Sequence, residues 1–135
     1  MIIRSLRVNH IENPLGYKMD KPFLSWTAES ETGKKQIAAR VEISLSETFD
    51  SLEFDSGLRA DISPLGYAPE LTLQPRTRYF WRVTVVSDCG ETATSAPAWF
   101  ETGKQDEAWQ AKWIRAPYEN SVHPILKKVF TLKEK

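Results

Sequence analysis

Residues 73–83 constrain the fold of this chain more than any other part of its sequence. From Tyr79 onward, alternate residues are apolar, which is the pattern of a β-strand with one buried face. The residues on this face are Tyr79, Trp81, Val83 and Val85. Pro75 favours a turn before the strand. The Leu-x-Pro-x-Thr-x-Tyr spacing is typical of a tyrosine at a corner between two sheets, where its hydroxyl bonds to backbone a few residues upstream. The segment therefore predicts a β-sandwich with a central strand at residues 79–87.

Six more segments have strand signals and are separated by turn residues. They are residues 2–8, 22–27, 36–46, 49–54, 70–73 and 92–102, the last interrupted by Pro97. No segment has a helical period of useful length. The pattern predicts an all-β, two-sheet sandwich of about seven strands over residues 1–103.

The alternation within these segments also predicts which side chains form the core. In residues 22–27, Leu24 and Trp26 point the same way, and residues 36–46 place a further apolar set on one face. The residues of that set are Val41, Ile43 and Leu45. Residues 13–16 and 88–91 are predicted as turns, the second with Gly90 at positive φ, and residues 62–69 as an irregular connection.

The composition changes after Gly103. Residues 104–107 form a polar linker, Trp109 and Trp113 follow, and residues 126–132 have the pattern of one further strand. A single strand cannot form a core of its own. Residues 104–135 are therefore predicted to be a linker and the truncated start of a second β-sandwich domain. The alternative is a C-terminal β-extension that folds back onto the sandwich.

The charge balance and cysteine content restrict the classes of function. The 18 basic residues equal the 18 acidic ones, which argues against a nucleic-acid partner and gives no reason to expect attraction to an anionic membrane. Cys89 is the one cysteine, so an intrachain disulfide cannot form. The first residues lack the apolar run of a signal peptide. We expect a cytoplasmic location, with a periplasmic or secreted parent protein as the alternative.

Two levels of resemblance to known proteins follow from these motifs. The tyrosine corner and Trp26 resemble a fibronectin type III domain of the immunoglobulin-like class. A larger set of short segments occurs in an order that resembles the N-terminal region of bacterial α-L-rhamnosidases, the inverting glycoside hydrolases that remove terminal rhamnose. These segments are residues 6–9, 13–16, 22–26, 55–57, 78–83, 99–103 and 111–114.

The resemblance implies that this chain carries no catalytic residues of its own. In that family the first domain is a fibronectin-like sandwich without catalytic residues. A second β-sandwich follows, whose opening resembles residues 109–132 here, and the catalytic acids lie much later on a helical barrel. We therefore expect a non-catalytic structural or accessory domain with no cofactor, and with the following domains of the same polypeptide as partners. A homodimer contact is a further candidate. The alternative is a carbohydrate-binding or protein-binding module.

The titratable residues give no competing site. Asp50, Glu53 and Asp55 are the best local group of acids, but they are better explained as a solvated sheet edge. His10 and His123 do not form a metal-binding pattern. Cys89 lies in the turn predicted at residues 88–91 and has no adjacent base in the sequence. We therefore assign no catalytic, cofactor-binding or metal-binding residue.

The aromatic residues are the candidate contact site. The chain has five tryptophans, and the strand phase points Phe80 and Trp99 outward. Exposed aromatic rings serve either a domain interface or a sugar-binding surface. We expect Phe80, Trp99, Trp109 and Trp113 to contact a neighbouring domain rather than sugar, with weak or no direct sugar binding.

Overall fold

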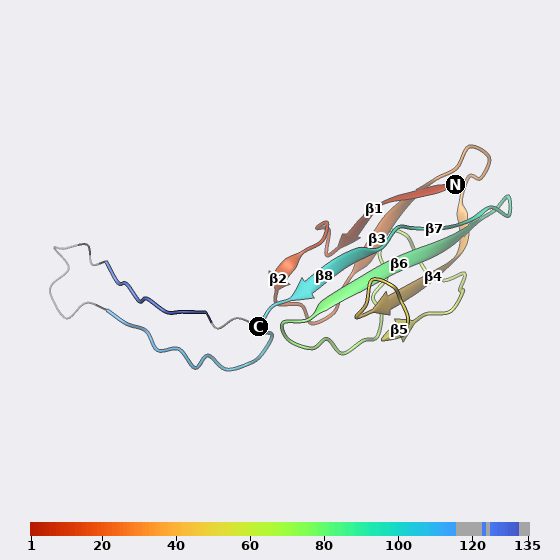
Figure 1. The fold of residues 1–135 in the computed structure, drawn as a ribbon. Coiled ribbons are helices and arrows are strands. Elements are labelled where there is room, and N and C mark those ends of the chain that lie inside the picture. The colour runs from red at the N-terminus through yellow and green to blue at the C-terminus, as the bar shows by residue number, and fades with distance from the viewer. Residues whose placement is uncertain (116–122, 124, 133–135) are drawn as a thin grey trace.

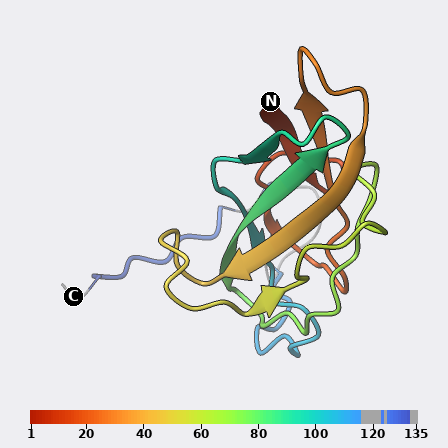
Figure 2. The same ribbon diagram turned by 90° about the vertical axis from the view of Figure 1, so that its right-hand side faces the viewer.

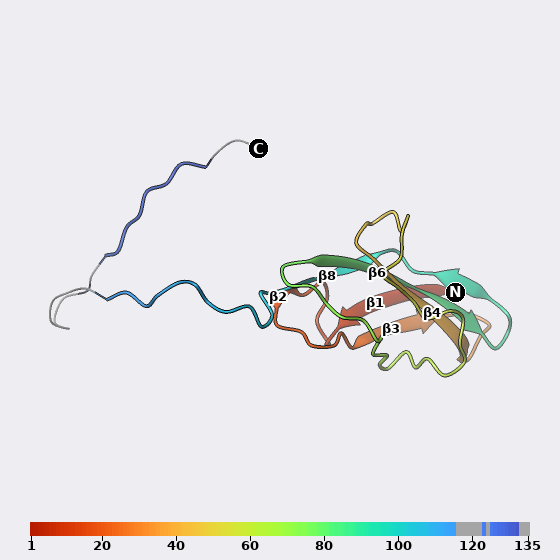
Figure 3. The same ribbon diagram turned by 90° about the horizontal axis from the view of Figure 1, so that it is seen from below.

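The computed structural model describes residues 1–115, 123 and 125–132. Its elements are β1 (Ile2–Val8), β2 (Leu15–Tyr17), β3 (Leu24–Glu29), β4 (Gln36–Ser44), β5 (Phe54–Asp55), β6 (Arg78–Ser87), β7 (Thr92–Thr94) and β8 (Ala98–Thr102). β1 and β3 pair in a small sheet, which lies against a larger sheet with the order β2-β8-β6-β4-β5 (Figures 1 and 3). The prediction of an all-β sandwich is confirmed. Within the described residues, no helix has the length and hydrophobicity of a membrane span.

Strand β6 holds the larger sheet together. It pairs antiparallel with β4 on one side, and with β8 and then β7 on the other. Figure 2 shows β6 in green running beside β4 in gold, with β5 next to the end of β4. Along β6 the residues alternate between buried and partly exposed from Tyr79 to Ser87. The alternation of apolar residues in the sequence therefore correctly predicts which side chains of this strand face the core.

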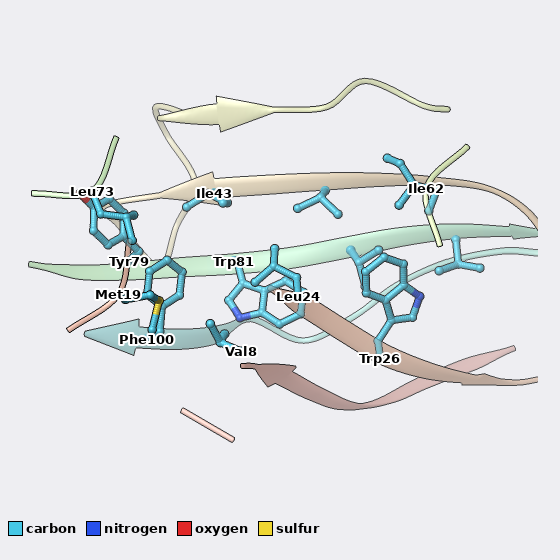
Figure 4. Close-up of a cluster of buried hydrophobic side chains, with 14 residues drawn as sticks. Val8, Met19, Leu24, Trp26, Ile43, Ile62, Leu73, Tyr79, Trp81 and Phe100 are labelled. Carbon is cyan, nitrogen blue, oxygen red and sulfur yellow. The ribbon is translucent and has the colours of Figure 1, made fainter. Parts of the chain in front are cut away.

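The core lies between the two sheets and is built around large aromatic side chains. Trp81 and Phe100 are fully buried, and the ring of Tyr79 stacks on Phe100 with 5.2 Å between centroids. Trp26 enters from β3 and donates its indole hydrogen to Oε1 of Gln36 at 3.1 Å. Figure 4 shows these rings with Leu24, Ile43 and other apolar side chains between the layers. The predicted inward positions of Trp26 and Trp81 are confirmed.

The tyrosine corner forms as its spacing predicts. The backbone N–H of Gln74 donates to the hydroxyl of Tyr79 at 2.8 Å, five residues along the chain. Tyr79 is 2% exposed, and Leu73 also packs into the core. The bond fixes the crossing segment against the first residues of β6.

The strand predicted at residues 70–73 is wrong. The amide of Leu71 donates to the carbonyl of Pro69, and the amide of Gln74 donates to Tyr79. These two amides are used in local bonds rather than in a ladder with another strand. Leu73 is buried without being part of a strand.

The end of β4 also differs from the prediction, which placed Leu45 in the core. Ser44 is fully buried and its hydroxyl donates to the carbonyl of Ser51 at 2.7 Å and accepts from the amide of Ser46 at 3.0 Å. This serine turn ends the strand, so Leu45 lies 49% exposed. The strand predicted at 49–54 is present only as Phe54–Asp55. Phe49 has φ of 57°, which interrupts an extended backbone at the predicted start.

Two edges of the sandwich complete the fold. β2 lies where a turn was predicted, and it pairs parallel with β8. Residues 62–69, predicted as an irregular connection, cover the free edge of β3 through reciprocal backbone bonds of 2.8 Å between Leu24 and Tyr67. The expected interruption at Pro97 divides residues 92–102 into β7 and β8. Gly90 has φ of 86° in the β6–β7 hairpin, as predicted.

The chain leaves the sandwich after β8, at the end where β2 lies (Figure 1). The described residues beyond Thr102 form no strand, including those within the predicted strand at 126–132. A lone segment has no neighbour to receive its backbone hydrogen bonds, so the apolar alternation alone does not produce a strand.

We expect Tyr79→Phe to lower the free energy of unfolding by about 1–2 kcal/mol, because the amide of Gln74 loses its acceptor while the ring stays packed. Urea unfolding of the variant and the wild type measures the difference. Tyr17→Phe is the matched control, since Tyr17 is 52% exposed. Equal stability of the two variants would show that the corner bond does not stabilise the fold.

Candidate functional site

The outward face of the larger sheet carries two of the predicted aromatic residues. Phe80 of β6 lies directly opposite Trp99 of β8 in the strand register, and both side chains are half-buried. Phe80 faces Ser44 of β4 on its other side. The sheet therefore brings Phe80 and Trp99 into one aromatic surface, which we call the β6–β8 face.

Two arginines stack on aromatic rings at this face. The guanidinium carbon of Arg78 lies 4.3 Å from the ring centroid of Trp99, and that of Arg82 lies 4.3 Å from the centroid of Phe49. Such stacks contribute about 0.5–1 kcal/mol at exposed sites. Phe49 reaches Arg82 from the loop after β4, a contact that strand periodicity could not predict. Each arginine is thereby held beside an aromatic ring.

Each of these arginines is also neutralised by a glutamate. Arg82 donates to both carboxylate oxygens of Glu42, at 2.9 and 3.1 Å, and Arg78 donates to Glu101 at 3.0 Å. Glu42 is 5% exposed although it points outward, and Arg40 lies 3.4 Å from it. Buried charges must be paired in this way. The β6–β8 face is therefore aromatic and close to neutral, and lacks the positive field that would attract an acidic ligand.

The acids considered as a catalytic group lie at the edge of the same sheet. Asp55 accepts from Nε and Nη2 of Arg40 at 2.8 and 2.7 Å. These bonds, with a further one from the amide of Gly57, hold the pKa of Asp55 well below its ordinary value, at about 2. A group with this pKa is ionised near neutral pH and cannot act as a general acid there. Asp50 accepts from the hydroxyl of Thr48, and Glu53 is exposed.

The remaining titratable candidates lie outside this face. The thiol of Cys89 contacts the hydroxyls of Ser87 at 3.0 Å and Thr32 at 3.4 Å, and these contacts lower its pKa. The ring of His10 lies 6.1 Å from that of Phe23, and His123 is exposed. In the part of the chain that the structure describes, no three His, Cys, Asp or Glu side chains are grouped as a metal site.

The other two predicted aromatic residues lie beyond the sandwich. Trp109 is 79% exposed, with Nζ of Lys104 lying 4.5 Å from its ring centroid, and Trp113 is fully exposed. Further apolar residues of this segment are exposed as well. They are Ile114, Ile125, Leu126, Val129, Phe130 and Leu132. The structure therefore joins Phe80 and Trp99 in one surface and leaves Trp109 and Trp113 in a separate apolar segment.

Sequence reasoning missed two exposed apolar residues at the edge of the sheet. Leu15 and Tyr17 of β2 are 60% and 52% exposed, and Leu15 pairs with Glu101 beside the β6–β8 face. Pro14 and Gly16 on either side of Leu15 favour the turn predicted at residues 13–16, and Tyr17 lies outside every element predicted from the sequence. A strand of three residues is too short for alternation to be recognised.

Comparison with known proteins gives consistent results from sequence and from structure. A family model described as "Rha78A-like, N-terminal immunoglobulin domain" matches residues 3–106. A curated α-L-rhamnosidase of Streptomyces avermitilis is 38% identical over 130 residues, which cover 92% of this chain and 13% of that protein. This chain thus spans about an eighth of that relative's length. A match to 92% of the chain also has to include much of the segment after residue 106.

Two solved structures share the fold. The crystal structure of the Streptomyces avermitilis α-L-rhamnosidase complexed with L-rhamnose matches with a TM-score of 0.73 and 37% identity, covering 86% of this chain and 12% of that one. The α-L-rhamnosidase from Dictyoglumus thermophilum matches with a TM-score of 0.76 and 30% identity, covering 85% and 14%.

We expect the Arg40–Asp55 pair to stabilise the fold in a pH-dependent way. Because folding lowers the pKa of Asp55 from 3.8 to about 2, its contribution is fully present above pH 3.8 and is lost as the pH falls through about 2. The stability difference between wild type and Asp55→Asn should therefore be largest near neutral pH and shrink between about pH 4 and pH 2. Urea unfolding across this range measures it.

Asp50→Asn is the control for that series, because Asp50 lies in the adjacent exposed loop and contacts a threonine rather than an arginine. The same pH dependence in both variants would show that the Arg40 contact does not cause the effect. A carboxyl titration by NMR gives the pKa of Asp55 directly.

Proposed function

This chain belongs to the family of Rha78A-like N-terminal immunoglobulin domains, and on that premise we propose that it is a non-catalytic accessory domain of an α-L-rhamnosidase. The observation that carries the proposal is the match of one small sandwich to 12–14% of two solved rhamnosidases at 30–37% identity. In this proposal, hydrolysis of terminal α-L-rhamnose is the activity of the longer protein. The role of this chain is to pack against and orient its neighbours.

The arrangement of acids supports a role without chemistry. Inverting glycosidases use two carboxyl groups about 6.5–9.5 Å apart, one as the acid and one as the base that activates water. Asp55 is locked ionised by Arg40, and the buried Glu42 is held between Arg40 and Arg82. The carboxyl of Asp55 is therefore not available as a general acid near neutral pH, and both oxygens of Glu42 are occupied by hydrogen bonds to Arg82.

The segment after residue 107 is proposed to be part of the next domain. Its tryptophans and aliphatic residues are exposed, and an accumulation of exposed large apolar side chains is typical of a surface that another domain covers. The similarity to the Streptomyces avermitilis protein continues into this segment. We assign residues 1–103 to the sandwich, and 104–135 to the connection and the first part of a second β-domain.

The β6–β8 face is proposed to contact that neighbouring domain. Its aromatic rings are half-buried, its arginines are neutralised, and Trp99 precedes the exit of the chain at Gly103 by only four residues. A neutral, aromatic surface with fixed polar groups is typical of a domain interface. A sugar-binding surface is the competing explanation, because Trp99 presents a flat ring.

We expect the purified chain to show no turnover of an aryl α-L-rhamnoside above the buffer rate, measured by release of the chromogenic phenol. Saturable turnover that depends on the chain would contradict the proposal. The reading frame beyond codon 135 gives an independent test. A continuation that encodes a helical barrel supports the rhamnosidase, whereas a stop codon or tandem sandwiches favours a protein-binding module.

We expect titration with L-rhamnose to produce no saturable NMR shift at the indole of Trp99 or the ring of Phe80, because both face a protein partner in this proposal. The spectra of Trp99→Ala and Trp109→Ala are the matched comparison. A saturable shift that Trp99→Ala abolishes and Trp109→Ala retains would establish the sugar-binding alternative.

A further inference from the structure

The residues that follow β8 are fastened to the sandwich rather than released from it. The amide of Gly103 donates to the carbonyl of Tyr17, and the carbonyl of Gly103 accepts from the amide of Arg76, both at 2.8 Å. The two chains approach so closely that a β-carbon on Gly103 would lie 2.6 Å from the carbonyl oxygen of Gly16. Glycine is therefore required for this contact between β2 and the departing chain.

Gln105 forms the second fastening and uses both ends of its amide. Its Oε1 accepts from the amide of Met19 at 2.9 Å, and its Nε2 donates to the carbonyl of Met19 at 2.7 Å. The side chain thus supplies one donor and one acceptor to a single residue, as a neighbouring strand would. Met19 is 2% exposed and belongs to the core, so the amide is anchored to a fixed point. Gln105 itself has φ of 52°.

Two ion pairs also connect the residues after β8 to the sandwich. Lys18 bonds Asp106 at 2.6 Å, which raises the pKa of Lys18, and Arg76 pairs with Glu107. Exposed pairs of this kind contribute little one by one. Their importance here is geometric, because they connect consecutive residues of the departing chain to two separate supports. One support is the segment after β2, and the other is the turn before β6.

We infer that residues 103–107 form a rigid joint, with Gln105 as its central clamp, that fixes the direction in which the polypeptide leaves the sandwich. The inference deepens the proposed accessory role and rests on it for its biological meaning. The predicted polar linker at 104–107 describes the composition of these residues, whereas the side chains of Gln105, Asp106 and Glu107 are bonded to the sandwich. The partner that the joint positions is the segment beginning at Ala108.

The physical consequence is a restriction of where the next domain can lie. A flexible linker of five residues lets its ends explore about 5–6 Å multiplied by the square root of its length in every direction. A segment that is bonded to the sandwich restricts the chain to one direction of departure, next to β2 and the β6–β8 face. The neighbouring domain is then held close to that face, which raises its effective concentration there.

Distances between two spin labels test the joint directly. One label goes on the native Cys89, which is exposed in the β6–β7 hairpin at the far end of the sandwich from the exit (Figure 1). The other goes on Ala108→Cys, the first residue after the joint. A reference pair within the sandwich uses Cys89 and Thr72→Cys, where Thr72 is exposed. Pulsed dipolar spectroscopy then gives the distribution of distances for each pair.

We expect the Cys89–Ala108 distribution to be as narrow as the reference distribution, and Gln105→Ala to broaden it about twofold, as for a freed linker. Gln110→Ala, an exposed glutamine beyond the clamp, should leave the width unchanged. A broad distribution with Gln105 intact, or an unchanged width in Gln105→Ala, would overturn the inference. The readout needs no rhamnoside, so the joint and the proposed function can fail independently.

Discussion

The hydrogen bond between Tyr79 and the backbone of Gln74 is the interaction on which the rest of the structure depends. It fixes the turn at Pro75 against the start of β6. The same turn is held from the opposite side, because Thr102 Oγ1 donates to the carbonyl of Gln74 at 2.6 Å and accepts from the amide of Thr77 at 3.0 Å. The corner therefore connects the central strand to the last residue of β8, and through that residue to the point where the chain leaves the domain.

Alternation predicted the fold wherever a strand is paired along its whole length. The phase of β6 correctly separated Tyr79 and Trp81 from Phe80, because a strand with neighbours on both sides cannot rotate its faces. Prediction failed where a side chain or a local turn satisfied the backbone instead. Ser44 bonds across its own turn and moves Leu45 into solvent. Whether a side chain replaces a neighbouring strand as the hydrogen-bond partner of the backbone depends on the folded structure. It therefore leaves no periodic pattern in the sequence.

The candidate face was predictable in its aromatic residues and not in its polar ones. The outward phase of Phe80 and Trp99 follows from the strand pattern, and their pairing follows from the register of β6 and β8. The ring of Phe49 over Arg82, and the burial of Glu42 beneath them, require the loop after β4 to fold back over the sheet. The contact of Phe49 with Arg82 joins a loop to a strand 33 positions away in the chain, so it depends on the completed fold.

The exit of the chain shows why composition is a poor guide to stiffness. Charged and amide side chains near Gly103 favour a solvated linker when they are considered one by one. In the folded chain, each such side chain has a complementary group within reach. Gln105 faces both polar groups of Met19, and Asp106 faces Lys18. A polar segment becomes rigid when its partners lie on a fixed surface, since each bond then costs only the entropy of one side chain. A domain whose exit is set in this way can orient its neighbours without taking part in their chemistry.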